Sequence, residues 1–312
     1  MDGCCATECD CLREAARCGD TETVKALLAA GADPYAEFGI AIQYAAEFGH
    51  LEAVKVLIAA STENHVGYDF AIWISVQNAH IEVVKALIAA GVNVNAKYNP
   101  PLHVAVIKNR PAIVKVLIDA GADVHHNNSY ALTSAILSGY LEIVKLLLDA
   151  GADTNSKDGY FLQFAIKRDS FEILELLLAN GADTNARFHI LRWAVWSGYP
   201  QCVKILLNAG ADVNYQEGHA LRTAIERDFL EIVEILISAG IDVFADDHCA
   251  LRLAVKNNNK EIARTLAFSY TKEELQSLQE TLQSPMLAGV IHRHMPRGSY
   301  TKAALRDHAT IE

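Results

Sequence analysis

Residues 139–155 read GYLEIVKLLLDAGADTN, and this stretch decides the fold. Val144 is followed three and four positions later by Leu147 and Leu148, which is the spacing of apolar side chains on one face of an α-helix. Gly151 follows Leu148 three positions later and tolerates the left-handed backbone on which helices often end. The stretch therefore predicts a short amphipathic helix that ends at a glycine turn.

The same pattern recurs along most of the chain. Each copy opens with an apolar anchor residue, and successive anchors lie 30 residues apart seven times and 29 residues apart once. Seven positions after the anchor, every copy except one has Gly, Asn or Asp, which favour a tight turn. Each copy therefore reads as helix, turn, helix and loop. The nine anchors are Leu12, Ile42, Ile72, Leu102, Leu132, Leu162, Leu191, Leu221 and Leu251.

Helices of about ten residues are marginal in water, and a single pair buries little apolar surface. Stacked pairs cover one another, so that stability comes from the contacts between neighbours. The repeat predicts an all-α solenoid over residues 10–268, between a cysteine-rich flexible N-terminus at 1–9 and a C-terminal segment at 269–312.

The repeats resemble the ankyrin repeat. The segments GHLEAVKVLIAA from Gly49, GYLEIVKLLLDAGADTN from Gly139 and NAGADVN from Asn208 are similar to its second half. The usual start of its first helix survives only at 100–103, as PPLH, and the period is short, which implies shortened inter-repeat loops. The resemblance implies an ankyrin-repeat solenoid of about nine units that binds a partner protein. Similar short units occur in giant DNA viruses, and ankyrin arrays occur in effectors of intracellular bacteria, so an effector or adaptor in the host-cell cytosol is an alternative.

In ankyrin arrays the positions five and six past the anchor line the concave face. Ile107, Leu137 and Trp196 are large apolar side chains at the fifth position, and Lys167 and Arg168 lie between them in the sequence. Trp and Arg within an apolar strip are typical of an interface hot spot. These five residues are the predicted partner-binding surface, although neighbouring loops could equally cover them in part.

A second set of candidates lies four positions before the anchors. If these side chains reach the loop tips, the groove is aromatic at one end and acidic at the other; packing within the loops is the alternative. The acidic end, with the formal net charge of −11, favours a partner that carries basic residues. The candidates are Phe38, Tyr68, Tyr98, Asp158, Glu217 and Asp247.

Charge and composition exclude other classes of function. A net charge of −11 opposes nucleic-acid binding, and no apolar run approaches the roughly 18 residues of a membrane helix. The N-terminus lacks the apolar stretch of a signal peptide, so we expect a cytoplasmic protein. We also expect it to be a monomer. No phosphate-binding glycine loop or nucleophile motif is present, which predicts a protein without catalytic residues or cofactors.

Two clusters that resemble metal sites belong to the repeat consensus. His50 and His80 each precede a Leu-Glu or Ile-Glu pair, and Asp-x-Asn at 153–155 recurs in later loops. Cys4, Cys5, Cys9 and Cys11 could supply four thiolates to zinc or accept a lipid, but they lack Cys-x-x-Cys spacing. A reduced flexible end, with no bound metal, is the favoured interpretation; a metal-dependent regulator is the alternative.

The C-terminal segment is expected to cap the array. Tyr270 replaces the glycine of internal copies, and Thr271 with Glu274 forms the pattern of a helix-capping box. Pro285 is expected to end this helix, and from Met286 a mildly basic tail without a clear pattern follows. Residues 270–312 could alternatively recruit a second protein.

Overall fold

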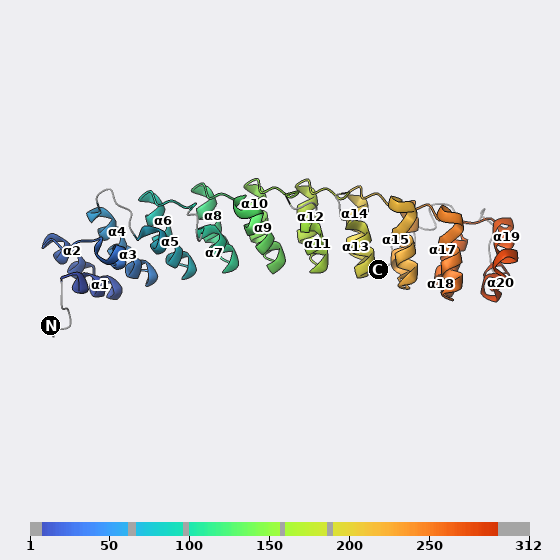
Figure 1. The fold of residues 1–312 in the computed structure, drawn as a ribbon, viewed down its shortest axis with the longest axis horizontal. Coiled ribbons are helices and arrows are strands. Elements are labelled where there is room, and N and C mark those ends of the chain that lie inside the picture. The colour runs from blue at the N-terminus through green and yellow to red at the C-terminus, as the bar shows by residue number, and fades with distance from the viewer. Residues whose placement is uncertain (1–7, 62–66, 96–99, 157–159, 186–189, 293–312) are drawn as a thin grey trace, which may run out of the picture. The chain divides into compact units, whose positions relative to one another are not determined.

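The computed structural model describes residues 8–61, 67–95, 100–156, 160–185 and 190–292. This part of the chain contains twenty α-helices and no β-strand (Figure 1). It divides into two compact units, Met1–Asp153 and Thr154–Glu312. The expectation of an all-α fold is confirmed.

Within each unit the helices form pairs, and successive first helices and successive second helices contact one another. The first unit contains α1 (Glu8–Cys18), α2 (Thr21–Ala29), α3 (Ala36–Glu47), α4 (Leu51–Ala60), α5 (Tyr68–Gln77), α6 (Ile81–Ala89), α7 (Pro101–Ile107), α8 (Pro111–Asp119), α9 (His126–Ser138) and α10 (Leu141–Asp149). The second unit contains α11 (Tyr160–Lys167), α12 (Phe171–Ala179), α13 (Ile190–Ser197), α14 (Pro200–Asn208), α15 (Tyr215–Glu226), α16 (Leu230–Ser238), α17 (Ala245–Lys256), α18 (Lys260–Ala267), α19 (Lys272–Leu282) and α20 (Pro285–His292).

The core of each unit follows the repeat register. All nine anchors are buried, and so is the residue twelve positions after each of them, from Val24 in α2 to Ala263 in α18. These residues lie on the faces of the two helices that meet the neighbouring pair, so each pair covers the apolar surface of the next. The predicted stacking is confirmed within both units.

The turn inside each pair is left-handed in every copy. The residue seven positions after the anchor has a positive φ whether it is Gly49 (75°), Ala79 (65°) or Asn109 (51°). At Gly49 a Cβ atom would lie 2.6 Å from the His80 ring, so the glycine also allows the next repeat to approach. His80 Nε2 lies 3.0 Å from the Glu47 carbonyl oxygen, which gives this histidine a structural role between repeats.

The loops that contain Asn-Val-Asn at 93–95 and Asp-Thr-Asn at 153–155 join neighbouring repeats by hydrogen bonds. In the first unit, Asn95 Oδ1 accepts a hydrogen bond from the Asp123 N–H at 2.8 Å, and Asn95 Nδ2 donates to the Gly121 carbonyl at 3.0 Å. Asn155 makes the same two bonds in the second unit, to Asp183 and to Gly181. The recurring loop sequence, which the repeat consensus contains, therefore connects neighbouring repeats.

A single left-handed turn joins the loop to the first helix. Residues three to five positions before the anchor have positive φ at 37–39 in α3 and at 246–248 in α17, where all three angles lie between 51° and 74°. The regular part of both helices begins after this turn.

The C-terminal pair of helices closes the second unit. Tyr270 is completely buried, and its hydroxyl donates to the Val243 carbonyl at 3.0 Å. Thr271 and Glu274 form the predicted capping box at the start of α19. The helix α19 ends at Leu282, before Pro285, with Gln283 in a left-handed conformation as its C-cap. The expectation of an unpatterned tail from Met286 is wrong for residues 286–292, because Pro285 begins α20, and Leu287 of that helix is buried.

Candidate functional site

The five predicted partner-binding residues divide between the two units. Ile107 at the end of α7 and Leu137 in α9 belong to the first unit, with 52% and 44% of their surface exposed. Lys167, Arg168 and Trp196 belong to the second, and Trp196 is 49% exposed. The structure brings Lys167 and Trp196 into one groove and leaves Ile107 and Leu137 outside it.

The groove lies in the second unit and has a volume of about 780 Å³. It is lined by residues of α11 and α13, by Tyr199 directly before α14, and by Arg227 directly after α15. Because helices rather than long loops carry most of the lining, the side chains are held on a rigid frame. The lining residues are Tyr160, Gln163, Phe164, Lys167, Trp193, Trp196, Ser197, Tyr199 and Arg227.

Aromatic rings form the floor of this groove. Tyr160 and Phe164 lie one turn apart on α11, with ring centroids 6.0 Å apart in a stacked arrangement. Trp193 and Trp196 on α13 meet edge to face at 5.6 Å. The rings support one another and remain open to solvent, since Tyr160, Trp193 and Trp196 are each between 38% and 49% exposed. Exposed Trp and Tyr side chains grouped in a groove are characteristic of protein interfaces.

Two cations accompany the aromatic rings. The Arg227 guanidinium lies over the Trp196 ring, 4.4 Å from its centroid. Lys167, the last residue of α11, also lines the groove. Neither cation has an ion-pair partner among the described residues, and the lining contains no carboxylate. The groove is therefore a local cationic and aromatic surface on an acidic chain.

Of the nine lining residues, the sequence predicted only Lys167 and Trp196, and the missed residues include three aromatic side chains and Arg227. Phe164 and Trp193 lie two positions past their anchors and Tyr160 lies two before, whereas candidates were expected only five and six positions past the anchors and four before them. Arg227 lies at the sixth position of its copy and could have been found by reading that position in all repeats. Phe164 and Trp193 gave no such signal, because the same position holds the buried Ile74 in another copy. The position of Tyr160 holds exposed aromatic residues in two other copies, Phe70 and Tyr130, and could have been found from that pattern.

The loop candidates have different outcomes. Phe38 is 81% exposed, and Asp247 is exposed but bonded to Arg252 at 2.5 Å. Tyr68 is only 2% exposed because it begins α5 and packs into the core, so the expectation that it contacts a partner is wrong. Three candidates are not described: Tyr98 and Asp158 lie outside the described residues, as does the side chain of Glu217.

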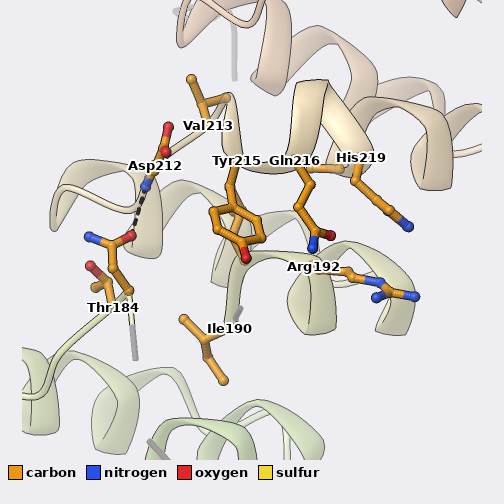
Figure 2. A pocket seen from close by; sticks show the side chains of 11 residues that line it. Thr184, Ile190, Arg192, Asp212, Val213, Tyr215, Gln216 and His219 are labelled. Carbon is orange, nitrogen blue, oxygen red and sulfur yellow. Dashed lines mark hydrogen bonds between the residues drawn. The ribbon is translucent and has the colours of Figure 1, made fainter. Parts of the chain in front are cut away.

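A second, smaller pocket of about 210 Å³ lies between α13 and α15 (Figure 2). Its polar side chains contribute to the repeat itself. The Asp212 N–H donates to Asn185 Oδ1 at 3.1 Å, and His219 Nδ1 lies 3.1 Å from the Thr223 hydroxyl (Figure 2 labels Asp212 and His219). We therefore assign this pocket to the packing of neighbouring repeats.

The described residues contain no group of three or more His, Cys, Asp and Glu side chains placed to hold a metal. Cys4 and Cys5 lie outside those residues, and Cys11 is a free, partly exposed thiol. Burial raises the pKa of the Cys202 thiol to about 12, so at neutral pH it is protonated and is not a nucleophile. None of the helices described is long and apolar enough to cross a membrane.

Comparison with protein families matches the chain to a model described as "Ankyrin repeats (3 copies)". The matched residues are 12–98, 42–128, 72–158, 135–217 and 191–276. Among solved structures, the chain is similar to the crystal structure of the ankyrin repeat domain of Bcl-3, described as a unique member of the IkappaB protein family, with a TM-score of 0.55 and 27% identity. The similarity covers 62% of this chain and 96% of that one. A search of curated proteins found no match.

Proposed function

Because the chain belongs to the ankyrin-repeat family, whose members generally mediate protein–protein interactions, we propose that it is a non-catalytic scaffold that binds a partner protein on its exposed first-helix ends. The observation that carries this proposal is the open groove in which Trp193 and Trp196 lie beside the unpaired cations Lys167 and Arg227. Such a surface supplies the anchors of an interface without contributing to the core.

The mechanism is preorganisation. The Trp196 ring already contacts the Trp193 ring and the Arg227 guanidinium, so little side-chain entropy is lost when a partner docks. The backbone is held by inter-repeat hydrogen bonds such as that from the Asp212 N–H to Asn185. Affinity then comes from a few anchored contacts rather than from total buried area.

Ile107 and Leu137 are proposed as a separate contact surface on the first unit. Each is about half exposed at the end of its first helix, where the fold does not require an apolar residue. Binding there and at the groove is tested separately, because the two sets of residues lie in different units.

The adaptor alternative, in which residues 270–312 recruit a second protein, has less support. Within the described part of that segment, Leu275 and Leu287 are completely buried, so α19 and α20 serve to cap the second unit. The groove therefore supports the scaffold proposal more strongly than the described part of residues 270–312 supports an adaptor.

The experiment is affinity capture from a cell lysate with the full chain, followed by mass spectrometry. Wild type is compared with Trp196→Ala, with the double variant Ile107→Asp and Leu137→Asp, and with Leu141→Ala, an exposed apolar residue outside both surfaces. Circular dichroism confirms that each variant is folded. A partner retained by wild type and Leu141→Ala but lost from Trp196→Ala supports the groove. Equal capture by all folded variants contradicts the proposal.

A further inference from the structure

We infer that the groove binds an acidic segment of the partner protein, in which an aromatic or aliphatic side chain lies between carboxylates. This inference rests on the proposed function and specifies the chemistry of its partner. It departs from the expectation of a basic partner, which came from the net charge of the whole chain and from the loop candidates. The charged side chains that line the groove beside the aromatic rings are positive, whereas the net charge of the whole chain is negative.

The lining of the groove contains cations and no carboxylate that would neutralise them. Lys167 and Arg227 are its two ionisable groups other than tyrosines, and neither is paired with a carboxylate among the described residues. Four other cations of the second unit have acidic partners, such as Lys204 with Glu231 at 3.6 Å, whereas others, such as Lys256, have none among the described residues. Unpaired cations beside a docking surface favour a partner that brings carboxylates, because this pairing also steers the encounter.

The wider surface has the same sign. At the fifth and sixth positions past the anchors, the second unit holds four cations and one carboxylate, Glu226. The carboxylate of Asp228, next to Arg227, already accepts a hydrogen bond from Asn259 Nδ2 at 3.0 Å. The four cations are Lys167, Arg168, Arg227 and Lys256.

The geometry of Arg227 adds specificity. Its guanidinium lies over the Trp196 ring, 4.4 Å from the centroid, and a guanidinium uses its face for such stacking. Its N–H groups lie in the guanidinium plane and remain able to donate to a carboxylate, often in bidentate fashion. A carboxylate bound to Arg227 would place the neighbouring partner side chain against the Trp196 and Trp193 rings.

Other occupants fit less well. Residues 293–312 of this chain carry four Lys or Arg residues against two acidic ones, so their charge repels the groove. Nucleic acid would stack on the rings and pair with the cations, but its phosphates would be repelled by a chain of net charge −11. An acidic protein segment needs only the local cations.

The test is selection of random peptides displayed on phage against the immobilised full chain. The same selection is run on Trp196→Ala, on the double variant Lys167→Glu and Arg227→Glu, and on the double variant Lys115→Glu and Lys145→Glu. The last variant makes the same change in net charge on α8 and α10, outside the groove. Circular dichroism establishes that each variant is folded before selection.

We expect wild type and Lys115→Glu/Lys145→Glu to enrich peptides with Asp or Glu next to an aromatic or aliphatic residue. A synthetic peptide of the enriched sequence should bind Trp196→Ala at least about tenfold more weakly than wild type. It should also bind several-fold more weakly at roughly 0.5 M than at 0.05 M NaCl, because salt screens exposed charge pairs. The Lys167→Glu/Arg227→Glu variant should enrich basic peptides instead.

Each other result overturns the inference in a distinguishable way. Basic or uncharged peptides whose binding needs Trp196 would leave the scaffold function in place and refute only the acidic partner. Acidic peptides that bind Trp196→Ala equally well would move the site elsewhere.

Tighter binding of a single-stranded oligothymidylate, lost in Trp196→Ala, would replace the protein partner by nucleic acid. Self-association of wild type that Trp196→Ala abolishes would replace it by a second copy. No enrichment on any variant would contradict the proposed function as well.

Discussion

Leu147 in the first unit and Leu177 in the second occupy the same repeat position, and both side chains are completely buried. Leu137 and Trp196 also share one position, yet Leu137 is 44% exposed outside the groove while Trp196 is 49% exposed within an aromatic cluster. The two units therefore have the same kind of residue at equivalent interior positions but differ at equivalent exposed positions. Interior positions are constrained by the same neighbours in every repeat, whereas exposed positions are free to differ and so carry recognition.

The largest effect is expected in the shared interior. Leu147→Asp and Leu177→Asp should each lower the free energy of unfolding by about 4 kcal/mol or more, because an isolated carboxylate would be buried where no partner exists. Urea unfolding followed by circular dichroism measures the loss. Hydrogen exchange should show weakened protection in the neighbouring helix pair too, since each pair covers the next. An unchanged cooperative transition in either variant would contradict the stacked core.

The turn positions should give the next largest effect, again alike in both units. Gly49→Ala and Gly198→Ala should each cost roughly 2 kcal/mol, because the backbone is left-handed and the new Cβ would lie 2.6 Å from the His80 ring or 2.8 Å from the Phe229 ring. Ala79→Gly is the opposite change at an equivalent position and should stabilise the chain by about 0.5 kcal/mol. Thermal and urea unfolding measure all three. A larger loss in one unit than in the other would show that their turns are packed differently.

A smaller effect is expected in the pH dependence of stability, to which His103 should contribute in the first unit only. Burial, and then the nearby His126, lower the pKa of His103 below its ordinary value of 6.5. The unfolded chain therefore takes up a proton at a higher pH than the folded chain, and stability should fall as the pH drops below about 6.5. The equivalent residue in the first repeat of the second unit is Gln163.

His103→Gln copies that residue into the first unit and should flatten the dependence of stability on pH between about 7.5 and 5.5. Urea midpoints at several pH values measure the slope, and NMR titration of His103 gives its pKa directly. A pKa at or above 6.5, or an unchanged slope in His103→Gln, would show that this histidine does not distinguish the units.

The smallest effect on stability is expected at the exposed surfaces. Ile107→Asp, Leu137→Asp and Trp196→Ala should each change the free energy of unfolding by less than about 1 kcal/mol, because roughly half of each side chain already faces solvent. Their effects should appear in binding instead. If one of them unfolds the protein, that side chain belongs to the interior rather than to a recognition surface.

Much of the fold could be predicted from the sequence because its repeat is local. The spacing from Leu132 to Leu162 and the glycines such as Gly139 identify helices and turns without knowledge of distant contacts. The helix α20 could not be predicted, since Pro285 is compatible both with the end of one helix and with the first turn of another. Burial of Leu287 against the preceding helices decides between the two.

The candidate site was predicted only in part. Lys167 and Trp196 were found because the fifth position faces outward in every repeat, but the other predicted apolar residues, Ile107 and Leu137, fall in a different unit. Tyr68 was misassigned because a single repeat position can be a loop tip in one copy and a core position in another: Phe38 is exposed and Tyr68 is buried at that position.

The sequence by itself determined that this protein is a stack of helix pairs, because each pair needs only its own apolar faces and those of its neighbours. It also determined where each turn lies, through residues that accept a left-handed backbone. Tertiary structure alone decided which exposed side chains meet. Trp196 and Arg227 are 31 positions apart in the sequence, and only the packing of α13 beside α15 brings the guanidinium over the ring.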